Sequence, residues 1–325
     1  MKRILGIGNA LVDIIIPTLS DEPLGRFSLP KGSMTHVTAD LADAILLETE
    51  TMDRRQAAGG SAANTIHGLA ALGVATGFVG KTGRDPLGDY FHRELVAAGV
   101  DTNLLPGTSR TGTAIAFITP DSERTFATHL GAAVELTAEE IADEVFPGYD
   151  LLHIEGYLVQ NHALVERAIR QAAAAGLKVS LDLASFNVVR ENLDFIRRLV
   201  ADYADLVFAN EDESAAFTGE RDPLAAAAMM ASHGAIAVVK LGDKGSLVRQ
   251  GDQVIRVPVA PSRPLDTTGA GDLYAAGFLY GLISGLPLDR CGAAGSLLAA
   301  RVIEVYGARI PPEQWPALRE QLQAL

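Results

Sequence analysis

The chain alternates short apolar runs with alanine-rich stretches of helical spacing, and this alternation limits its possible folds most strongly. The apolar runs resemble buried strands and include 4–7, 75–79, 151–154, 178–183, 206–209 and 235–241. Stretches such as 163–175 and 223–232 have the spacing of helices. Strands that alternate with helices of this length form βαβ units around a mainly parallel sheet. We therefore predict an α/β fold with a mostly parallel central sheet.

Two segments depart from the alternation. Residues 11–37 contain β-branched and turn residues without helical periodicity, and residues 111–119 alternate at period two with 124–129 as a hairpin partner. We predict that they form a small second sheet, which would cover a site as a lid and exclude water. The predicted organisation is one domain over 1–325 with a discontinuous lid at about 11–37 and 108–130.

Thr137 and Glu140 have the spacing of a capping box. A capping box satisfies two backbone N–H groups at the start of a helix. The sequence therefore predicts a helix over 138–145.

Composition excludes several classes of partner. The formal net charge of −13 argues against nucleic acid and membrane surfaces, which select basic faces. A single cysteine, Cys291, rules out an internal disulfide and fits a reducing compartment. No apolar segment of signal-peptide length precedes the first strand, and no stretch approaches the ~18 apolar residues of a membrane span. We expect a cytoplasmic protein without a membrane partner.

Two glycine motifs resemble nucleotide-binding loops but lack the required context. Residues 75–82 match a relaxed P-loop, yet positions 76–79 are themselves the strand and no helix begins at Lys81-Thr82. Gly6-Ile7-Gly8 suggests a dinucleotide fingerprint, but Leu11 occupies the position of the third glycine. We therefore do not predict a P-loop, and a Rossmann dehydrogenase stays only as a distant alternative.

The run Asp266-Thr267-Thr268-Gly269-Ala270-Gly271-Asp272 precedes an apolar helical stretch and carries the strongest chemical signal. Its glycines let backbone N–H groups converge on an anion, and the helix N-terminus adds partial positive charge. Asp272 is either a helix cap or a base that accepts a proton from an attacking hydroxyl. An anion hole beside a base is the core of a phosphoryl-transfer site.

Two further motifs are suited to a hydroxyl-bearing ligand. Residues 9–13 are predicted to close the first strand with Asp13 at its carboxyl end, and ligands of open α/β sheets bind at the carboxyl ends of strands. Gly59-Gly60-Ser61 precedes the helical run 65–72, with Asn64 one turn further on. Paired glycines permit close approach of the backbone to a ligand. Turn and cap residues are the alternative interpretation of both motifs.

Two motifs at strand ends suit a metal ion and a nucleotide. Three carboxylates at 211–213 follow Asn210 and could bind Mg²⁺ directly or through its waters, although acids also favour helix N-termini. The segment 240–246 combines lysines with glycines, which suits phosphates or a hairpin turn. The seven histidines show no metal-ligand spacing, and no Gly-x-Ser-x-Gly elbow of a serine hydrolase occurs.

Taken in chain order, these motifs resemble the ribokinase-like (PfkB) family of carbohydrate and nucleoside kinases. Six of them span nearly the whole chain: Gly8-Asn9…Asp13, Gly59-Gly60-Ser61…Asn64, Val79-Gly80-Lys81…Gly83…Asp85…Gly88, Asn210…Glu213, Lys240-Leu241-Gly242…Gly245 and the run from Asp266 to Asp272. The resemblance implies a three-layer α/β/α fold with a β lid, and phosphoryl transfer from ATP with Mg²⁺.

The resemblance also assigns roles to residues. Asp272 would be the base and Gly269, Ala270 and Gly271 the anion hole. The acceptor would contact Asn9, Asp13, Gly59, Gly60, Ser61 and Asn64. The nucleotide would lie by Asn210, Lys240, Gly242, Asp243, Gly245 and Thr268. Glu213 would hold Mg²⁺ through water, and Asp266, Thr268 and Gly307 fall where some members hold a monovalent cation such as K⁺.

Three segments of the sequence narrow the choice of molecule that would accept the phosphoryl group. Residues 8–13, 27–34 and 110–113 resemble the adenosine-kinase-like branch, which phosphorylates the 5′-hydroxyl of a nucleoside. A free-sugar kinase acting on ribose, fructose or 2-keto-3-deoxygluconate is the alternative enzyme. A catalytically silent ligand sensor is the alternative class, although the intact Asp272 argues against it. Candidate walls for a base are Met34, Phe117 and Phe186.

The predicted lid also bears on assembly. Exposed edge strands in a small sheet favour pairing with a second copy, and this predicts a homodimer through the lid. A monomer with a folded-over lid is the alternative.

Overall fold

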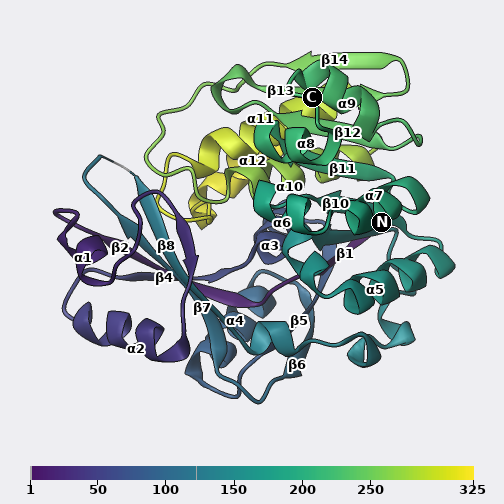
Figure 1. The fold of residues 1–325 in the computed structure, drawn as a ribbon. Coiled ribbons are helices and arrows are strands. Elements are labelled where there is room, and N and C mark those ends of the chain that lie inside the picture. Colours follow the sequence, from purple (N-terminus) through teal and green to yellow (C-terminus); the bar gives the residue numbers. More distant parts are fainter. Residues whose placement is uncertain (1, 122) are drawn as a thin grey trace.

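The computed structural model describes residues 2–121 and 123–325, and its main element is a nine-stranded sheet (Figure 1). Residue 1 of the predicted domain and residue 122 of the predicted lid lie outside the described residues. The strand order is β14 (Gln253–Val257), β13 (Ser246–Gln250), β12 (Ile236–Lys240), β11 (Leu206–Asn210), β10 (Lys178–Asp182), β9 (Leu151–Glu155), β1 (Arg3–Ile7), β5 (Ala75–Thr82) and β6 (Asp101–Pro106). The strands from β12 to β6 are parallel, while β13 and β14 are antiparallel additions at one edge.

Both faces of this sheet are buried because side chains of a strand point alternately to either side. In β1, Ile4 joins the core of one face, and Leu5 and Ile7 join the core of the other. The first core is covered by α3 (Ser61–Ala71), α4 (Pro86–Ala97), α10 (Ala270–Ile283), α11 (Leu288–Val302) and α12 (Trp315–Gln323). The second is covered by α5 (His162–Ala174), α6 (Phe186–Glu191), α7 (Leu193–Asp202), α8 (Glu211–Thr218) and α9 (Pro223–Met230). The predicted three-layer α/β fold is confirmed.

A second sheet of five described strands lies beside the body, at the left of Figure 1. Its order is β3 (Met34–His36), β8 (Arg124–Gly131), β7 (Thr111–Ile118), β2 (Leu11–Pro17) and β4 (Arg55–Gly59). Its accompanying helices are α1 (Glu22–Arg26) and α2 (Ala39–Glu48). The small sheet was predicted, but β4 was not, and it lies outside the predicted lid boundaries, which remain predictions.

The predicted helix over 138–145 is wrong. Two separate 3₁₀ turns occupy the segment, Ala138–Glu140 and Asp143–Val145. The capping box at Thr137 is present, but Ile141 is extended and its side chain is buried, which interrupts the helix. A capping box therefore does not guarantee a helix where a following side chain, here that of Ile141, is buried in the core.

The P-loop-like segment is a strand, as the sequence predicted. β5 continues through Lys81, and α4 begins only at Pro86. The ammonium of Lys81 donates to Glu140 at 2.6 Å and to the carbonyl of Glu135 at 3.1 Å. Lys81 thus holds the irregular segment after β8 against the sheet.

Within the described ranges, we find no helix with the length and hydropathy needed to cross a bilayer.

We expect Lys81→Met to destabilise the protein by about 2 kcal/mol, because it removes the cation that pairs with the Glu140 carboxylate. Urea unfolding measures the loss. The same variant should bind ATP as the wild type does, since Lys81 serves packing and not a phosphate. A large rise in the dissociation constant for ATP would revive the P-loop interpretation.

Candidate active site

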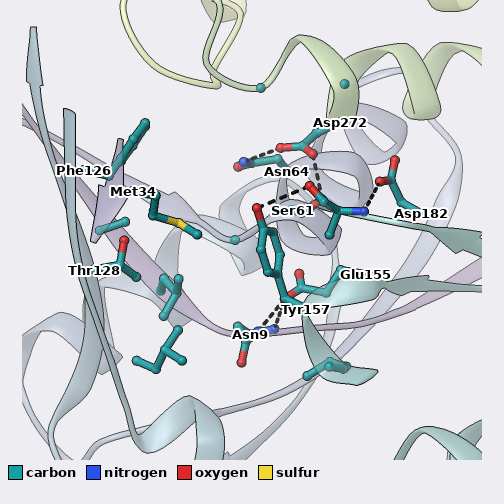
Figure 2. Close-up of a pocket in the computed structure, with 18 of the residues that line it drawn as sticks. Asn9, Met34, Ser61, Asn64, Phe126, Thr128, Glu155, Tyr157, Asp182 and Asp272 are labelled. Atoms are coloured by element: carbon teal, nitrogen blue, oxygen red, sulfur yellow. Dashed lines mark hydrogen bonds between the residues drawn. The ribbon is translucent and has the colours of Figure 1, made fainter. Parts of the chain in front are cut away.

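The carboxyl ends of five neighbouring parallel strands supply the polar floor of one cavity. The strands β1, β9, β10, β11 and β12 end at or just before Asn9, Glu155, Asp182, Asn210 and Lys240. In register, Glu155 pairs with Asp182 and Asn210 pairs with Lys240. All five residues line a cavity of about 730 Å³, to which the small sheet adds side chains (Figure 2). Strand order therefore gathers residues that are far apart in sequence.

Asp272 lies in the first turn of α10, where Gly269 caps the helix with a left-handed φ of 74°. The Ser61 hydroxyl donates to Oδ1 of Asp272 at 2.7 Å, and Nδ2 of Asn64 donates to Oδ2 at 2.9 Å (Figure 2). Burial raises the pKa of Asp272, while the hydrogen bonds from Asn64 and Ser61 oppose that rise. Helix α3 thus fixes the carboxylate in a direction that faces the cavity.

The double glycine lets the turn before α3 pack directly on two polar residues. Gly60 has a φ of 96°, and a Cβ there would lie 2.1 Å from the carbonyl oxygen of Asn9. A Cβ on Gly59 would lie 2.1 Å from Oδ1 of Asp13. Asp13 lies within β2 of the small sheet, so the prediction that it ends the first strand is wrong, although its side chain does line the cavity. Burial raises its pKa to about 7.

Glu155 ties three elements together and was missed in the sequence. Its Oε1 accepts from the backbone N–H of Asn9 at 2.9 Å and from Nδ2 of Asn9 at 2.6 Å. Its Oε2 accepts from the N–H of Ala62 at 2.9 Å. Burial raises the pKa of Glu155 to about 7. A carboxylate at the end of a predicted parallel strand was the available signal, as it was for Asp182.

Asn210 and Glu213 form a capping box at the start of α8. Oδ1 of Asn210 accepts from the Glu213 N–H, and the Glu213 carboxylate accepts from the Asn210 N–H, both at 2.8 Å. Both residues also line the cavity. Glu211 and Asp212 are exposed and line a separate surface hollow, so the three acidic residues do not gather as one metal site.

The contacts of Glu213 bear on its predicted role toward Mg²⁺. Among the described residues, no group of three or more His, Cys, Asp or Glu side chains could hold a metal ion. The buried carboxylate of Glu213 accepts one hydrogen bond at each oxygen, which leaves lone pairs for metal-bound water. These contacts are compatible with the predicted role of Glu213 toward Mg²⁺, a hard ion that keeps several of its waters.

The predicted nucleotide-binding residues divide into two groups. Asn210, Lys240, Gly242 and Thr268 line the cavity. Asp243 and Gly245 do not belong to its described lining. Gly245 serves the hairpin after β12, because its φ is 87° and a Cβ would lie 2.0 Å from the carbonyl of Val257.

Of the residues predicted for other roles, Gly59, Ala270 and Asp266 also lie outside the described lining of the cavity. Gly269 and Gly271 are part of that lining.

Asp266 braces the turn before α10. Its Oδ1 accepts from the N–H and hydroxyl of Thr268 at 2.9 and 2.7 Å, and its Oδ2 accepts from the Gly307 N–H at 2.7 Å. Nε of Arg124 lies 3.6 Å from Oδ1. The Asp266 side chain thus holds the turn together, and the predicted monovalent-cation site, which would also use backbone oxygens, stays a prediction.

The small sheet gives the cavity an apolar wall. Met34 and Phe126 come from β3 and β8 and lie across the cavity from Asp272 (Figure 2). Further apolar lining residues are Leu11, Ala114, Leu130, Ala133, Val134, Leu136, Leu158 and Leu164. Of the predicted wall residues, Met34 takes part. Phe117 is instead buried against Phe27, with ring centroids 6.2 Å apart, and Phe186 lines the separate hollow.

Comparison with known proteins finds one family and several kinases to which this chain is similar. The family described as "pfkB family carbohydrate kinase" matches residues 37–315. The structure of adenosine kinase from Sinorhizobium meliloti is 35% identical, with a TM-score of 0.89, over 98% of this chain and 99% of that one. A probable sugar kinase from Rhizobium etli is 32% identical, with a TM-score of 0.89, over 99% of both chains. Guanosine-inosine kinase from Escherichia coli is 31% identical over 69% of this chain and 54% of that protein.

We expect Ser61→Ala to raise the pKa of Asp272 further, because one hydrogen bond to the ionised form is lost. Carboxyl ¹³C NMR titration of aspartate-labelled protein measures the change, with Asp272→Asn to assign the signal. Thr65→Val is the matched control. The Thr65 hydroxyl donates at 3.1 Å to the backbone carbonyl of Asp272, not to its carboxylate. Equal pKa values in the wild type and Ser61→Ala would contradict this role of Ser61.

Proposed function

Because the chain belongs to the pfkB family and is an ATP-dependent carbohydrate or nucleoside kinase, we propose that it phosphorylates a primary hydroxyl of a ribose-type sugar or nucleoside. The observation that carries this proposal is the Asp272 carboxylate, which α3 orients at the N-terminus of α10. It shares one cavity with the side chains suited to hydroxyl groups and with those suited to phosphates.

In the proposed reaction, Asp272 is the general base. The acceptor hydroxyl oxygen forms a bond to the γ-phosphorus of ATP, the bond from that phosphorus to the β,γ-bridging oxygen breaks, and the hydroxyl proton passes to Asp272. The raised pKa strengthens this carboxylate as a base. The first-turn N–H groups around Gly271 and the helix dipole stabilise the charge on the transferred group. Mg²⁺, when bound with ATP, neutralises phosphate charge, and Glu213 would hold one of its waters.

The hydroxyl groups of the acceptor would form hydrogen bonds with Asp13, with Asn64 and with the backbone of the turn at Gly60, just before α3. Oδ1 of Asn64 is buried, and among the described residues no donor reaches it. A buried acceptor without a partner costs free energy unless a ligand satisfies it. A sugar hydroxyl that donates to Oδ1 would do so while Nδ2 continues to hold Asp272.

The apolar wall favours a nucleoside over a free sugar. Each Å² of apolar surface removed from water contributes roughly 25 cal/mol, and a sugar ring alone offers little apolar surface to match Met34 and Phe126. A purine or pyrimidine base would cover this wall while the ribose meets the polar floor. The likeness to an adenosine kinase at 35% identity and to a guanosine-inosine kinase supports the same choice.

A catalytically silent sensor is less well supported. Two side chains from α3 converge on Asp272, whose burial is unfavourable for an ionised carboxylate. Such an arrangement serves a base, whereas a binding protein has no need of one.

We predict that Asp272→Asn lowers kcat by about 10²- to 10⁴-fold, because the amide cannot accept the proton. Coupled-enzyme turnover of ATP with the best acceptor measures the loss. Thermal unfolding of the variant should stay close to that of the wild type, since the amide oxygen still accepts from Asn64 or Ser61. Turnover within a few fold of the wild type would exclude Asp272 as the base.

We further predict that nucleosides such as adenosine, guanosine and inosine are phosphorylated with a higher kcat/KM than ribose or fructose. Phe126→Ala should raise the KM for the preferred nucleoside about 10-fold through lost apolar contact. Phe186→Ala is the matched control and should leave that KM unchanged, because Phe186 lines the separate hollow. A preference for ribose or fructose, untouched by Phe126→Ala, would favour the free-sugar kinase.

A further inference from the structure

A buried ion pair joins two strand ends on the nucleotide side of the cavity. Lys240 ends β12 and Asp182 ends β10, with β11 between them. Nζ of Lys240 donates to Oδ2 of Asp182 at 2.9 Å, and both side chains are largely buried, with 18% and 7% exposed. Both residues line the cavity, as does Asp272 (Figure 2). Asp182 has no part in the motifs found in the sequence.

The ammonium of Lys240 lies against the first turn of α10. A Cβ added to Gly271 would be 3.1 Å from Nζ of Lys240. The glycine therefore leaves the space that the ammonium needs to approach the helix N-terminus. This position places a full positive charge beside the backbone N–H groups that face the cavity, one residue before Asp272.

Asp182 is itself held from a second side. Its Oδ1 accepts from the N–H of Ala184 at 2.9 Å, and Ala184 has a left-handed φ of 63°. The hydroxyl of Tyr157 donates to the carbonyl of Ala184 at 3.4 Å. A non-glycine residue in this conformation is strained and persists only where its surroundings hold it. The turn after β10 therefore presents Asp182 to Lys240 in one orientation.

Acidic side chains outnumber basic ones in the described lining of the cavity. Five carboxylates are among its described lining residues: Asp13, Glu155, Asp182, Glu213 and Asp272. Lys240 and Arg124 are the two lysine or arginine side chains in that lining, and Arg124 donates to Thr268 at 3.2 Å. An anionic phosphate would be repelled from such a cavity without local positive charge.

Lys240 remains an ammonium in this setting. Burial would lower its pKa, but the negative charges of Asp182 and Glu213 and the hydrogen bond to Asp182 raise it above its ordinary value. A role in packing alone would not explain this buried ion pair, because apolar side chains of similar volume often replace such pairs without loss of stability.

We propose that Lys240 is a catalytic residue that contacts the transferred phosphoryl group beside Gly271, and that Asp182 is the positioning residue that holds its ammonium there. This inference rests on the kinase function proposed above. As the γ-phosphorus leaves the bridging oxygen for the acceptor oxygen, Lys240 donates to a non-bridging oxygen and keeps its own proton. Asp182 keeps its hydrogen bond with Nζ of Lys240 and prevents the flexible lysine stem from leaving this position.

A double-mutant cycle tests the pair. We expect Lys240→Met to lower kcat about 100-fold, and Lys240→Arg to retain more turnover because it keeps the charge. Asp182→Asn should lower kcat about 10-fold on its own, but less than about 2-fold in the Lys240→Met background, because Asp182 acts through Lys240. An equal loss in both backgrounds would overturn the positioning role. Wild-type kcat in Lys240→Met would overturn the catalytic role.

A second variant disturbs the ammonium without touching Asp182. Gly271→Ala places a methyl group against Nζ of Lys240, and α10 tolerates alanine at this helical position. Gly271→Ala should lower kcat strongly when residue 240 is the wild-type lysine. The loss should be only slight in the Lys240→Met background, because methionine lacks an atom at the Nζ position. A similar loss in both backgrounds would contradict contact between Lys240 and this turn. This arm remains informative if Asp182→Asn fails to fold.

Nucleotide binding separates this inference from the choice of acceptor. Calorimetry with a non-hydrolysable ATP analogue and with ADP needs no acceptor. We expect the wild type to bind the triphosphate more tightly, and Lys240→Met and Asp182→Asn to lose about 10-fold of that preference. Equal preference in all three proteins would overturn the inference even if the enzyme is a kinase. Loss of preference without turnover of any sugar or nucleoside would support the contact between Lys240 and the γ-phosphate, but it would contradict the proposed function and with it the catalytic role of Lys240.

Discussion

The site depends on the contact between the first turns of α3 and α10. These helices begin about two hundred residues apart in sequence, yet Ser61 and Asn64 donate directly to Asp272. Glu155 in turn accepts from the N–H of Ala62 and from Asn9, which fixes the start of α3 to the ends of β1 and β9. Because these are buried hydrogen bonds to carboxylates, breaking one leaves an unpaired polar group, which is costly. The direction of the Asp272 carboxylate is thus set by the sheet itself.

A second constraint is electrostatic. The chain carries a net charge of −13, and its cavity is lined by several carboxylates, yet a kinase must admit a nucleotide polyphosphate. The fold meets this requirement with the N-terminus of α10 and a few cations rather than with a broad basic surface. Burial raises the pKa of Asp13 and Glu155 to about 7, so these carboxyls repel an incoming anion less than exposed ones would. Individual residues and one helix N-terminus, rather than the net charge of the chain, therefore determine how this cavity receives an anion.

The two sheets contribute different chemistry to the one cavity. The parallel sheet supplies polar groups at its strand ends, where backbone geometry collects them, and the small sheet supplies an apolar wall through Met34 and Phe126. Transfer to a hydroxyl in competition with water benefits from such a cover. The acceptor proposed above spans the two surfaces, with hydroxyl groups on the polar floor and a base against the wall.

The sequence alone determined the α/β class and the small sheet, because strand and helix periodicities are local, and it identified Asp272, Asn64 and Lys240 through glycine-rich motifs that need only short spacing. It missed Glu155 and Asp182, whose neighbours in sequence are ordinary strand residues, and it took Phe117 and Phe186 as wall residues where Phe126 lines the cavity. Those facts depend on strand order and on which face of a lid strand turns inward. Only the tertiary structure decided them, since register and strand order arise from packing between segments distant in the chain.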